Sequence, residues 1–131
     1  GDGETALIEK ILSSDYNIIY NPKAWIYHVI SKDRMNIEYF KRRAFNQGIS
    51  DSFTIIRRNR GISKKEYNKL IERNSPSLFK DLSVLMKFRS YEYLKKYRQI
   101  TRSYIEGLQY HRGEIEKDNS LLNYVLSDTW L

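Results

Sequence analysis

The chain has 131 residues, of which 40% are hydrophobic and 30% charged, and its formal net charge is +7. This length favours a single domain, or one small domain with an extension. The sequence contains no cysteine, which excludes a disulfide framework and a cysteine-based zinc site. No run of the sequence approaches the ~18–20 consecutive apolar residues that a membrane-spanning helix needs.

The positive charge leaves the class of partner open. Basic residues are spread along the chain, with one tight cluster at residues 57–60 (RRNR). Helices commonly carry Lys and Arg on their solvent face, so a solvated basic surface is the main interpretation. Attraction to the phosphates of a small ligand, to anionic lipid headgroups or to nucleic acid is the alternative.

The beginning of the chain has short apolar runs. Residues 6–12 have the spacing of a short helix. Residues 16–20 (YNIIY) are rich in β-branched and aromatic residues and predict a strand. The dipeptide Asn21-Pro22 predicts a turn, because proline fixes its own φ and restricts the residue before it. Residues 24–30 (AWIYHVI) are nearly all apolar and predict a second strand, covered on both faces.

From Asn36 onward the pattern changes to the 3.6-residue period of helices. Asn36 is a candidate cap for a helix that runs from Ile37 to about Gly48. Gly48 marks either the end of that helix or a close approach between two backbones. Residues 51–58 fit a continued helix or a short strand, and we favour the helix.

The sequence predicts two further helix starts. Ser63 and Glu66 form a capping-box pattern, which predicts a helix to about Arg73. Ser75 and Pro76 follow as a predicted cap and first residue of the next helix.

A long, aromatic-rich amphipathic helix is predicted from Tyr91. It ends either at Gly113 or within the polar residues 116–120, and Ser120 is the predicted cap of a last short helix. The stripe of tyrosines on the long helix favours a core and helix–helix interface over a ligand site. His111 has no motif around it, and we expect it on a surface or helix face.

Three short motifs carry a resemblance to a known enzyme family. They are residues 3–7 (GETAL), residues 20–28 (YNPKAWIYH) and residues 43–50 (RAFNQGIS). In this order and at this spacing they resemble the end of the catalytic domain of family 2 glycosyltransferases, which are inverting enzymes with a GT-A fold. The family's nucleotide-binding strands and Asp-x-Asp metal motif would lie ahead of Gly1, and this chain contains no Asp-x-Asp.

The resemblance implies a mainly α, α+β fold, in which a short helix and two short strands end a GT-A α/β domain and a helical extension follows. Residues 1–52 would belong to the catalytic domain and residues 53–131 to the extension. The implied function is transfer of a sugar from a nucleotide-sugar donor to a hydroxyl acceptor with inversion, in cell-surface polysaccharide synthesis. The chain alone is predicted to be inactive, because the nucleotide-binding half is not in it.

The resemblance also implies catalytic and metal-binding residues. Glu4 falls at the position of the general base that takes the acceptor's proton, and Asp2 is its alternative. The structural interpretation of Glu4 is an acid placed at the positive end of a helix dipole. His28 would help to hold a divalent metal, Mn or Mg, in the intact enzyme, although a lone histidine in an apolar strand is usually a core residue. We expect no tightly bound metal on this chain alone.

The implied substrate-binding residues are Arg43, Gln47 and Arg42. Arg suits a donor phosphate because its planar guanidinium binds phosphate through two parallel hydrogen bonds. Arg43 matches the family position, whereas a solvated helix face is an equal interpretation of Arg42.

The expected partners of the intact enzyme are a nucleotide-sugar donor and a glycan or lipid-linked acceptor. The expected location is cytoplasmic, with peripheral contact to the inner face of the membrane as an open alternative. Two other hypotheses remain. One is a basic helical module that binds nucleic acid, with an affinity that added salt would lower. The other is a membrane-docking or partner-docking role for the helices of residues 63–131. Nucleic acid is the less favoured partner.

Overall fold

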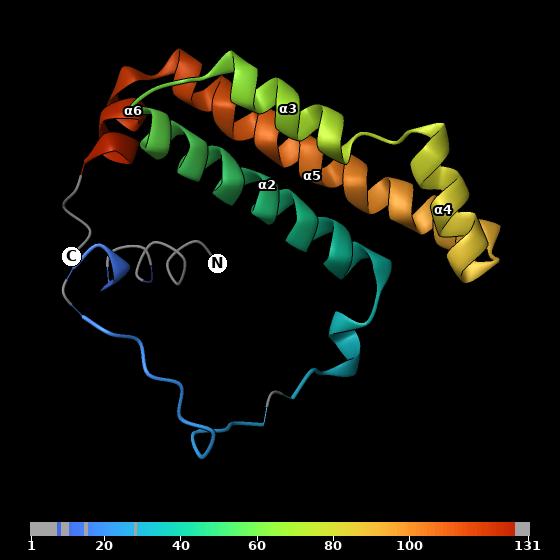
Figure 1. Ribbon diagram of the computed structural model, residues 1–131. Helices are drawn as coiled ribbons and strands as arrows, with labels where there is room; N and C mark the ends of the chain where they lie inside the picture. Colours follow the sequence, from blue (N-terminus) through green and yellow to red (C-terminus); the bar gives the residue numbers. More distant parts are fainter. Residues whose placement is uncertain (1–7, 9–10, 15, 28, 128–131) are drawn as a thin grey trace.

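The computed structural model of the protein describes residues 8, 11–14, 16–27 and 29–127. Five α-helices and one short 3₁₀ helix follow one another in the described part of the chain (Figure 1). In chain order they are η1 (Lys32–Arg34), α2 (Ile37–Asn59), α3 (Lys64–Asn74), α4 (Leu78–Phe88), α5 (Tyr91–Lys117) and α6 (Asn119–Leu126). We refer to α2 through α6 together as the helical body. The helix predicted at residues 6–12 lies mostly outside the described residues.

The predicted α+β fold is wrong, because no strand occurs among the residues that the structure describes. Residues 16–27 and 29–30, where both strands were expected, have no regular secondary structure apart from the turn at Pro22 and Lys23, and they run apart from the helical body (Figure 1). The predicted turn is present: the Ala24 N–H donates to the Asn21 carbonyl oxygen at 3.1 Å, and the Lys23 N–H donates to Asn21 Oδ1 at 3.0 Å. A strand is stabilised by a neighbouring strand, and the described part of this chain offers none.

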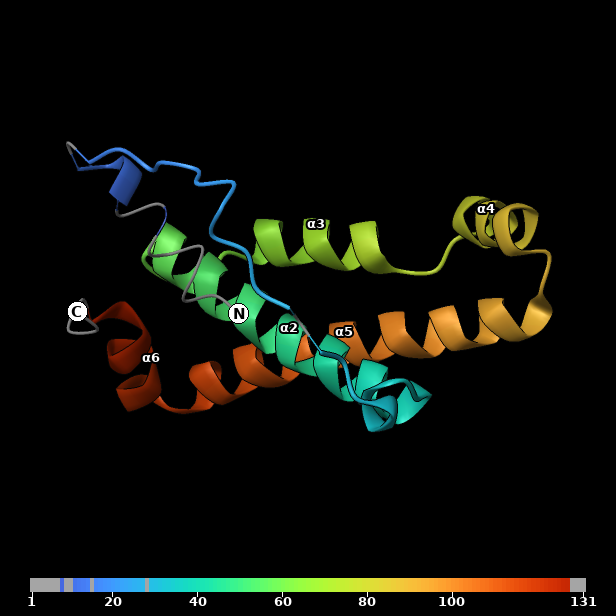
Figure 2. The ribbon, with the colours of Figure 1, turned by 90° about the horizontal axis from the view of Figure 1, so that it is seen from below.

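The centre of the helical body is the pair of long helices α2 and α5, which cross each other (Figures 1 and 2). Each helix places a glycine at the crossing. A Cβ on Gly48 would collide with the backbone of α5 at Tyr104, and a Cβ on Gly107 would collide with the backbone of α2 at Phe45. The prediction of a close backbone approach at Gly48 is therefore confirmed, and the alternative of a helix end there is wrong.

Helix α2 is continuous from Ile37 to Asn59, so the helix favoured for residues 51–58 is confirmed. The Asn36 side chain caps it, accepting a hydrogen bond from the Tyr39 N–H at 2.8 Å as predicted. The helix ends at Arg60, which adopts a left-handed conformation with φ 52°. Residue 52, the predicted domain boundary, lies inside this helix, and the division into two domains stays a prediction.

The other helix ends agree with the predictions only in part. Ser63 caps α3 as predicted, by accepting from the Glu66 N–H at 3.5 Å. The cap of α4 is Ser77 rather than Ser75: the helix begins at Leu78, two residues later than predicted, and the Ser77 hydroxyl accepts from the Lys80 N–H at 3.4 Å. Asp118 rather than Ser120 caps α6: its carboxylate accepts from the Ser120 N–H at 2.8 Å.

The core of the body is small and has two parts. One part joins Ile55, Tyr67 and Leu108 from α2, α3 and α5. The other part joins Ile56 of α2 to Ile115 and Val125 near the end of the chain. Gly113 lies within α5 instead of ending it, and α5 stops in the polar stretch that was the alternative prediction. Within the described residues, no helix has both the length and the apolar character needed to cross a membrane.

Candidate functional site

Three of the predicted site residues, Asp2, Glu4 and His28, lie outside the described residues. The roles of Glu4 as general base, of Asp2 as its alternative and of His28 as metal ligand stay predictions. The described residues next to His28 in sequence, Tyr27 and Val29, are 84% exposed each.

The other three predicted residues lie together near the start of α2. Arg42, Arg43 and Gln47 are all exposed. Arg43 and Gln47 are one turn apart, so the helix brings them onto one face. The guanidinium of Arg42 instead lies 5.9 Å from the centre of the Tyr39 ring, so this side chain is partly engaged within its own helix.

A hydrogen-bonded chain connects this face of α2 to α5. The Gln47 amide donates to Asp51 Oδ1 at 2.7 Å, and the Tyr104 hydroxyl donates to Asp51 Oδ2 at 2.6 Å. Burial and the Asp51 carboxylate raise the pKa of Tyr104 far above its ordinary value, so this phenol stays protonated. Asp51 therefore fixes Gln47 relative to the crossing of α2 and α5, which was not foreseen from the sequence.

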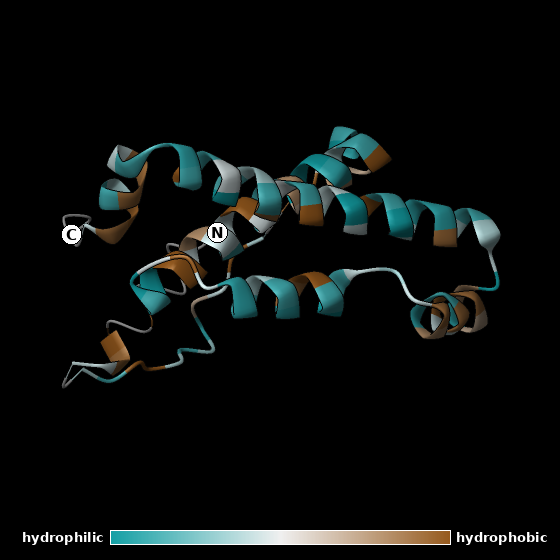
Figure 3. Ribbon diagram, turned by 90° about the horizontal axis from the view of Figure 1, so that it is seen from above, coloured by the Kyte–Doolittle hydropathy of each residue, from teal (hydrophilic) through white to brown (hydrophobic). Residues whose placement is uncertain are grey.

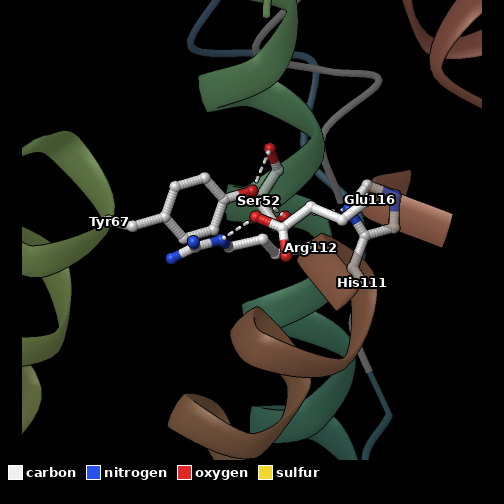
Figure 4. Close-up of polar contacts among 5 residues, drawn as sticks. All are labelled: Ser52, Tyr67, His111, Arg112 and Glu116. Carbon is white, nitrogen blue, oxygen red and sulfur yellow. Dashed lines mark hydrogen bonds and ion pairs between the residues drawn. The ribbon is translucent and has the colours of Figure 1, made fainter. Parts of the chain in front are cut away.

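A second polar group lies in the interior, where Ser52 stands between Tyr67 and His111 (Figure 4). The Ser52 hydroxyl is hydrogen-bonded to the Tyr67 hydroxyl and lies 2.8 Å from His111 Nδ1. Three helices meet at this point, because Ser52 comes from α2, Tyr67 from α3 and His111 from α5. Burial lowers the pKa of His111 and raises the pKa of Tyr67, so both side chains favour their neutral forms.

An ion pair covers one side of this interior cluster. Arg112 Nε donates to Glu116 Oε1 at 2.9 Å, and its guanidinium lies 5.2 Å from the centre of the Tyr67 ring. Figure 4 shows the Arg112 side chain reaching over Tyr67 from α5. The guanidinium thus holds the ring against the body through a cation–π contact.

A serine bonded to a histidine is also the pairing of a nucleophile and its base. Here, however, Ser52 and Tyr67 are both 0% exposed, so a substrate cannot reach the hydroxyl in this conformation. The cluster connects three helices and satisfies buried polar groups. His111 was expected on a surface or a helix face: it is half-buried on the inward face of α5, three residues after Leu108, so the surface alternative is wrong.

Two shallow hollows lie on the other half of α5. One has a volume of about 210 Å³ and is bordered by Lys95, Arg98 and Arg102; the other, of about 480 Å³, lies between Pro76 and the same two arginines. Arg98 Nη2 lies 2.5 Å from Asp81 Oδ2 and holds the pKa of Asp81 below its ordinary value. This ion pair fastens α4 to α5.

The basic cluster of residues 57–60 lies at the end of α2. The guanidinium of Arg57 is 5.7 Å from the centre of the Phe53 ring, and Arg60 forms the left-handed end of the helix. Part of this cluster therefore serves the helix itself, while its attraction for nucleic acid stays a prediction.

Among the described residues, no three His, Cys, Asp or Glu side chains gather as a metal ion would need. The divalent-metal site that the resemblance implies stays a prediction, since Asp2, Glu4 and His28 are outside the described residues. No protein-family model, curated protein or solved structure matches this chain.

Proposed function

We propose that the chain supplies the C-terminal, acceptor-side part of an inverting glycosyltransferase. In this proposal a sugar moves from a nucleotide-sugar donor to a hydroxyl group of a glycan or lipid-linked acceptor, in the cytoplasm or at the inner face of the membrane. The observation that carries it is the exposed apolar segment of residues 16–30. This segment has a strand-like sequence and a defined turn but no strand partner within the described residues.

The side chains of this segment favour burial against another surface. Five of its large apolar side chains are more than 80% exposed: Ile19, Tyr20, Ile26, Tyr27 and Val29. Burying one such side chain is worth about 1.5–3 kcal/mol, so leaving them all in water is costly. Another protein surface would cover these side chains, and the resemblance places residues 20–28 within the family's catalytic domain.

The proposed chemistry needs one carboxylate of this chain at the acceptor. Glu4, or Asp2 in its place, would take the proton as the acceptor oxygen attacks the anomeric carbon. The nucleoside diphosphate leaves from the opposite side of that carbon, which inverts its configuration. When bound, a divalent metal would neutralise the leaving diphosphate, and His28 is the residue of this chain proposed to ligate it.

Arg43 and Gln47 are proposed to bind substrate beside this carboxylate. They share one exposed face in the first half of α2, and the segment that would join the catalytic domain precedes this helix in the chain. The Arg43 guanidinium suits a phosphate oxygen pair, and the Gln47 amide suits a sugar hydroxyl.

The test is nucleoside diphosphate release by the natural protein that contains this chain, with a panel of nucleotide-sugars and added Mn²⁺. We expect release that depends on both donor and acceptor, and a product of inverted anomeric configuration by NMR. The isolated chain is the matched control and should release none. Retained configuration, or no release with any donor, would contradict the proposal.

A further inference from the structure

Helix α4 carries an apolar face that no described residue covers. We call Leu78, Phe79, Leu82 and Met86 the α4 stripe; they are 89%, 89%, 56% and 71% exposed, respectively. At 100° per residue these side chains lie within an arc of about 100°. The hydropathy colouring shows α4 as mostly apolar beside a largely polar α5 (Figure 3).

The opposite face of α4 is fixed to the body. Asp81 is buried and bonded to Arg98 of α5, while Val84 and Leu85 are partly buried. The Lys80 ammonium donates to the carbonyl oxygens of Arg73 and Ser75, at 2.7 and 2.8 Å, and so ties the start of α4 to the end of α3. The α4 stripe therefore points outward because its helix is anchored on the other side.

The charge around the stripe is strongly positive. Residues 78–102 contain seven Lys and Arg but only two acidic residues, so these 25 residues hold +5 of the chain's net charge of +7. Both acidic side chains are already paired, Asp81 with Arg98 and Glu92 with Lys96. We call residues 87–102 the basic band, because they follow the stripe directly and carry most of this charge.

We propose that α4 docks on an anionic lipid surface, with the α4 stripe in the interfacial layer and the basic band against the headgroup phosphates. An exposed apolar helix face bordered by Lys and Arg is the pattern of helices that lie in a membrane interface. The basic band complements the negative charge of the headgroups, and the α4 stripe complements the apolar region beneath them.

Two other occupants fit these observations less well. Nucleic acid would use the basic band, but it gives no cover to three aliphatic side chains of the stripe. A second copy of this chain would cover the stripe, but it would also bring two bands of the same charge together.

The first experiment measures partition of the full chain onto vesicles of phosphatidylcholine, with and without phosphatidylglycerol, at low and high salt. We expect binding that requires phosphatidylglycerol and weakens with salt. Leu78→Gln with Phe79→Gln should lower the partition coefficient about tenfold or more, because both side chains leave the interface. Ile26→Gln with Tyr27→Gln, which removes equally exposed apolar groups from the segment of residues 16–30, is the matched control.

A charge series tests the basic band in the same assay. Lys87→Gln and Lys95→Gln should each weaken binding about fivefold in low salt. Lys64→Gln and Lys65→Gln, at the exposed start of α3, are the matched controls and should change it much less.

A fluorescent probe tests which residue enters the lipid. The chain has no cysteine, so Phe79→Cys gives a single labelling position for an environment-sensitive dye. We expect a blue shift of the dye on phosphatidylglycerol vesicles at position 79, and none for a dye on Lys65→Cys.

Four results would overturn the proposal. The first is equal partition of the wild type and the Leu78→Gln, Phe79→Gln variant, and the second is loss of binding only in the Ile26→Gln, Tyr27→Gln variant. The third is a wild-type dimer in sedimentation where the Leu78→Gln, Phe79→Gln variant is a monomer. The fourth is salt-sensitive binding to DNA or RNA without binding to vesicles. Circular dichroism of each variant verifies that the helices are retained.

Discussion

The core of the helical body and the segment of residues 16–30 both contain large apolar side chains, but they differ in burial. Ile56, Tyr67 and Leu108 of the body are 0% exposed, whereas Ile26 of the segment is 88% exposed. With the α4 stripe as the exception, the helices of the body bury apolar side chains against one another, so this part of the chain supplies its own partners. A strand requires a neighbour for its backbone as well as a cover for its side chains, and the segment has neither among the described residues. We expect substitutions in the two regions to affect different properties.

The largest effect is expected on turnover, from Glu4→Gln in the natural enzyme that contains this chain. Gln keeps the shape of the side chain but cannot take the acceptor's proton, so turnover should fall ~10²–10⁴-fold if Glu4 is the base. Donor affinity should stay nearly unchanged, because the base acts on the acceptor. The measurement is initial-rate kinetics with donor and acceptor varied separately.

Asp2→Asn is the control for Glu4, and it should be mild. Full turnover of Glu4→Gln with loss in Asp2→Asn would move the base to Asp2. If both variants lower turnover only mildly, neither carboxylate is the general base, and the acid at the start of the chain would only cap a helix.

The second prediction concerns the stability of the body at the crossing of α2 and α5. Gly48→Ala places a methyl group against the α5 backbone at Tyr104. A helix backbone cannot shift aside as the flexible end of a side chain can. We expect the free energy of unfolding to fall by about 3 kcal/mol or more, at the upper end of overpacking effects. The measurement is urea unfolding followed by far-UV circular dichroism.

Gly113→Ala is the matched control, since a Cβ at Gly113 meets no atom within 4 Å. Alanine has the higher helix propensity, so this variant should gain about 0.5–1 kcal/mol. Equal effects of Gly48→Ala and Gly113→Ala would mean that α2 and α5 do not cross closely in solution.

The third prediction concerns the interior cluster. Ser52→Ala removes the hydroxyl that bonds both Tyr67 and His111, and leaves His111 Nδ1 without that partner. The free energy of unfolding should fall by about 1–3 kcal/mol. The exposed Ser83 of α4 is the control, and Ser83→Ala should change stability by less than about 0.5 kcal/mol.

The fourth prediction is a pH dependence of stability that belongs to the body. Burial places the pKa of His111 below its unfolded value of 6.5, so the folded state binds fewer protons than the unfolded state between these two values. Stability is therefore full above the unfolded pKa and falls as the pH drops through 6.5 toward the folded pKa. Thermal unfolding from pH 8 to pH 5 measures this slope.

The chain has two histidines, so the source of the slope can be assigned. His111→Gln should flatten the dependence between pH 5 and pH 7, and His28→Gln should leave it in place. The reverse outcome would assign the titration to the segment and would contradict a buried, neutral His111.

Local signals in the sequence predicted the helices well, whereas features that depend on a distant partner were missed. Asn36 and Ser63 cap their helices as predicted, because a cap is a contact within four residues. The prediction of Ser75 as cap, with Pro76 as the first helical residue, was wrong, because α4 begins two residues later, at Leu78, and Ser77 caps it. The role of His111 was missed, since Ser52 lies 59 residues away and no local pattern joins the two.

The two predicted strands were also wrong because their formation depends on a distant partner. Residues 16–20 and 24–30 have the composition of strands, and the turn between them forms at Asn21. Strand formation, however, depends on a ladder that these residues cannot build with the described helices. Composition thus indicates that the segment needs a neighbouring strand, and the described part of the chain does not provide one.

The smallest effect is expected from the segment itself. Ile26→Asn with Tyr27→Asn should change the free energy of unfolding of the isolated chain by less than about 0.5 kcal/mol, because these side chains are already 88% and 84% exposed. The same pair in the natural enzyme should lower turnover, because it removes apolar surface that the catalytic domain is proposed to bury. Urea unfolding of the isolated chain and activity of the enzyme measure the two effects separately. A loss of more than about 1 kcal/mol in the isolated chain would mean that the segment packs on the helical body in solution, and the contrast between the two regions would then disappear.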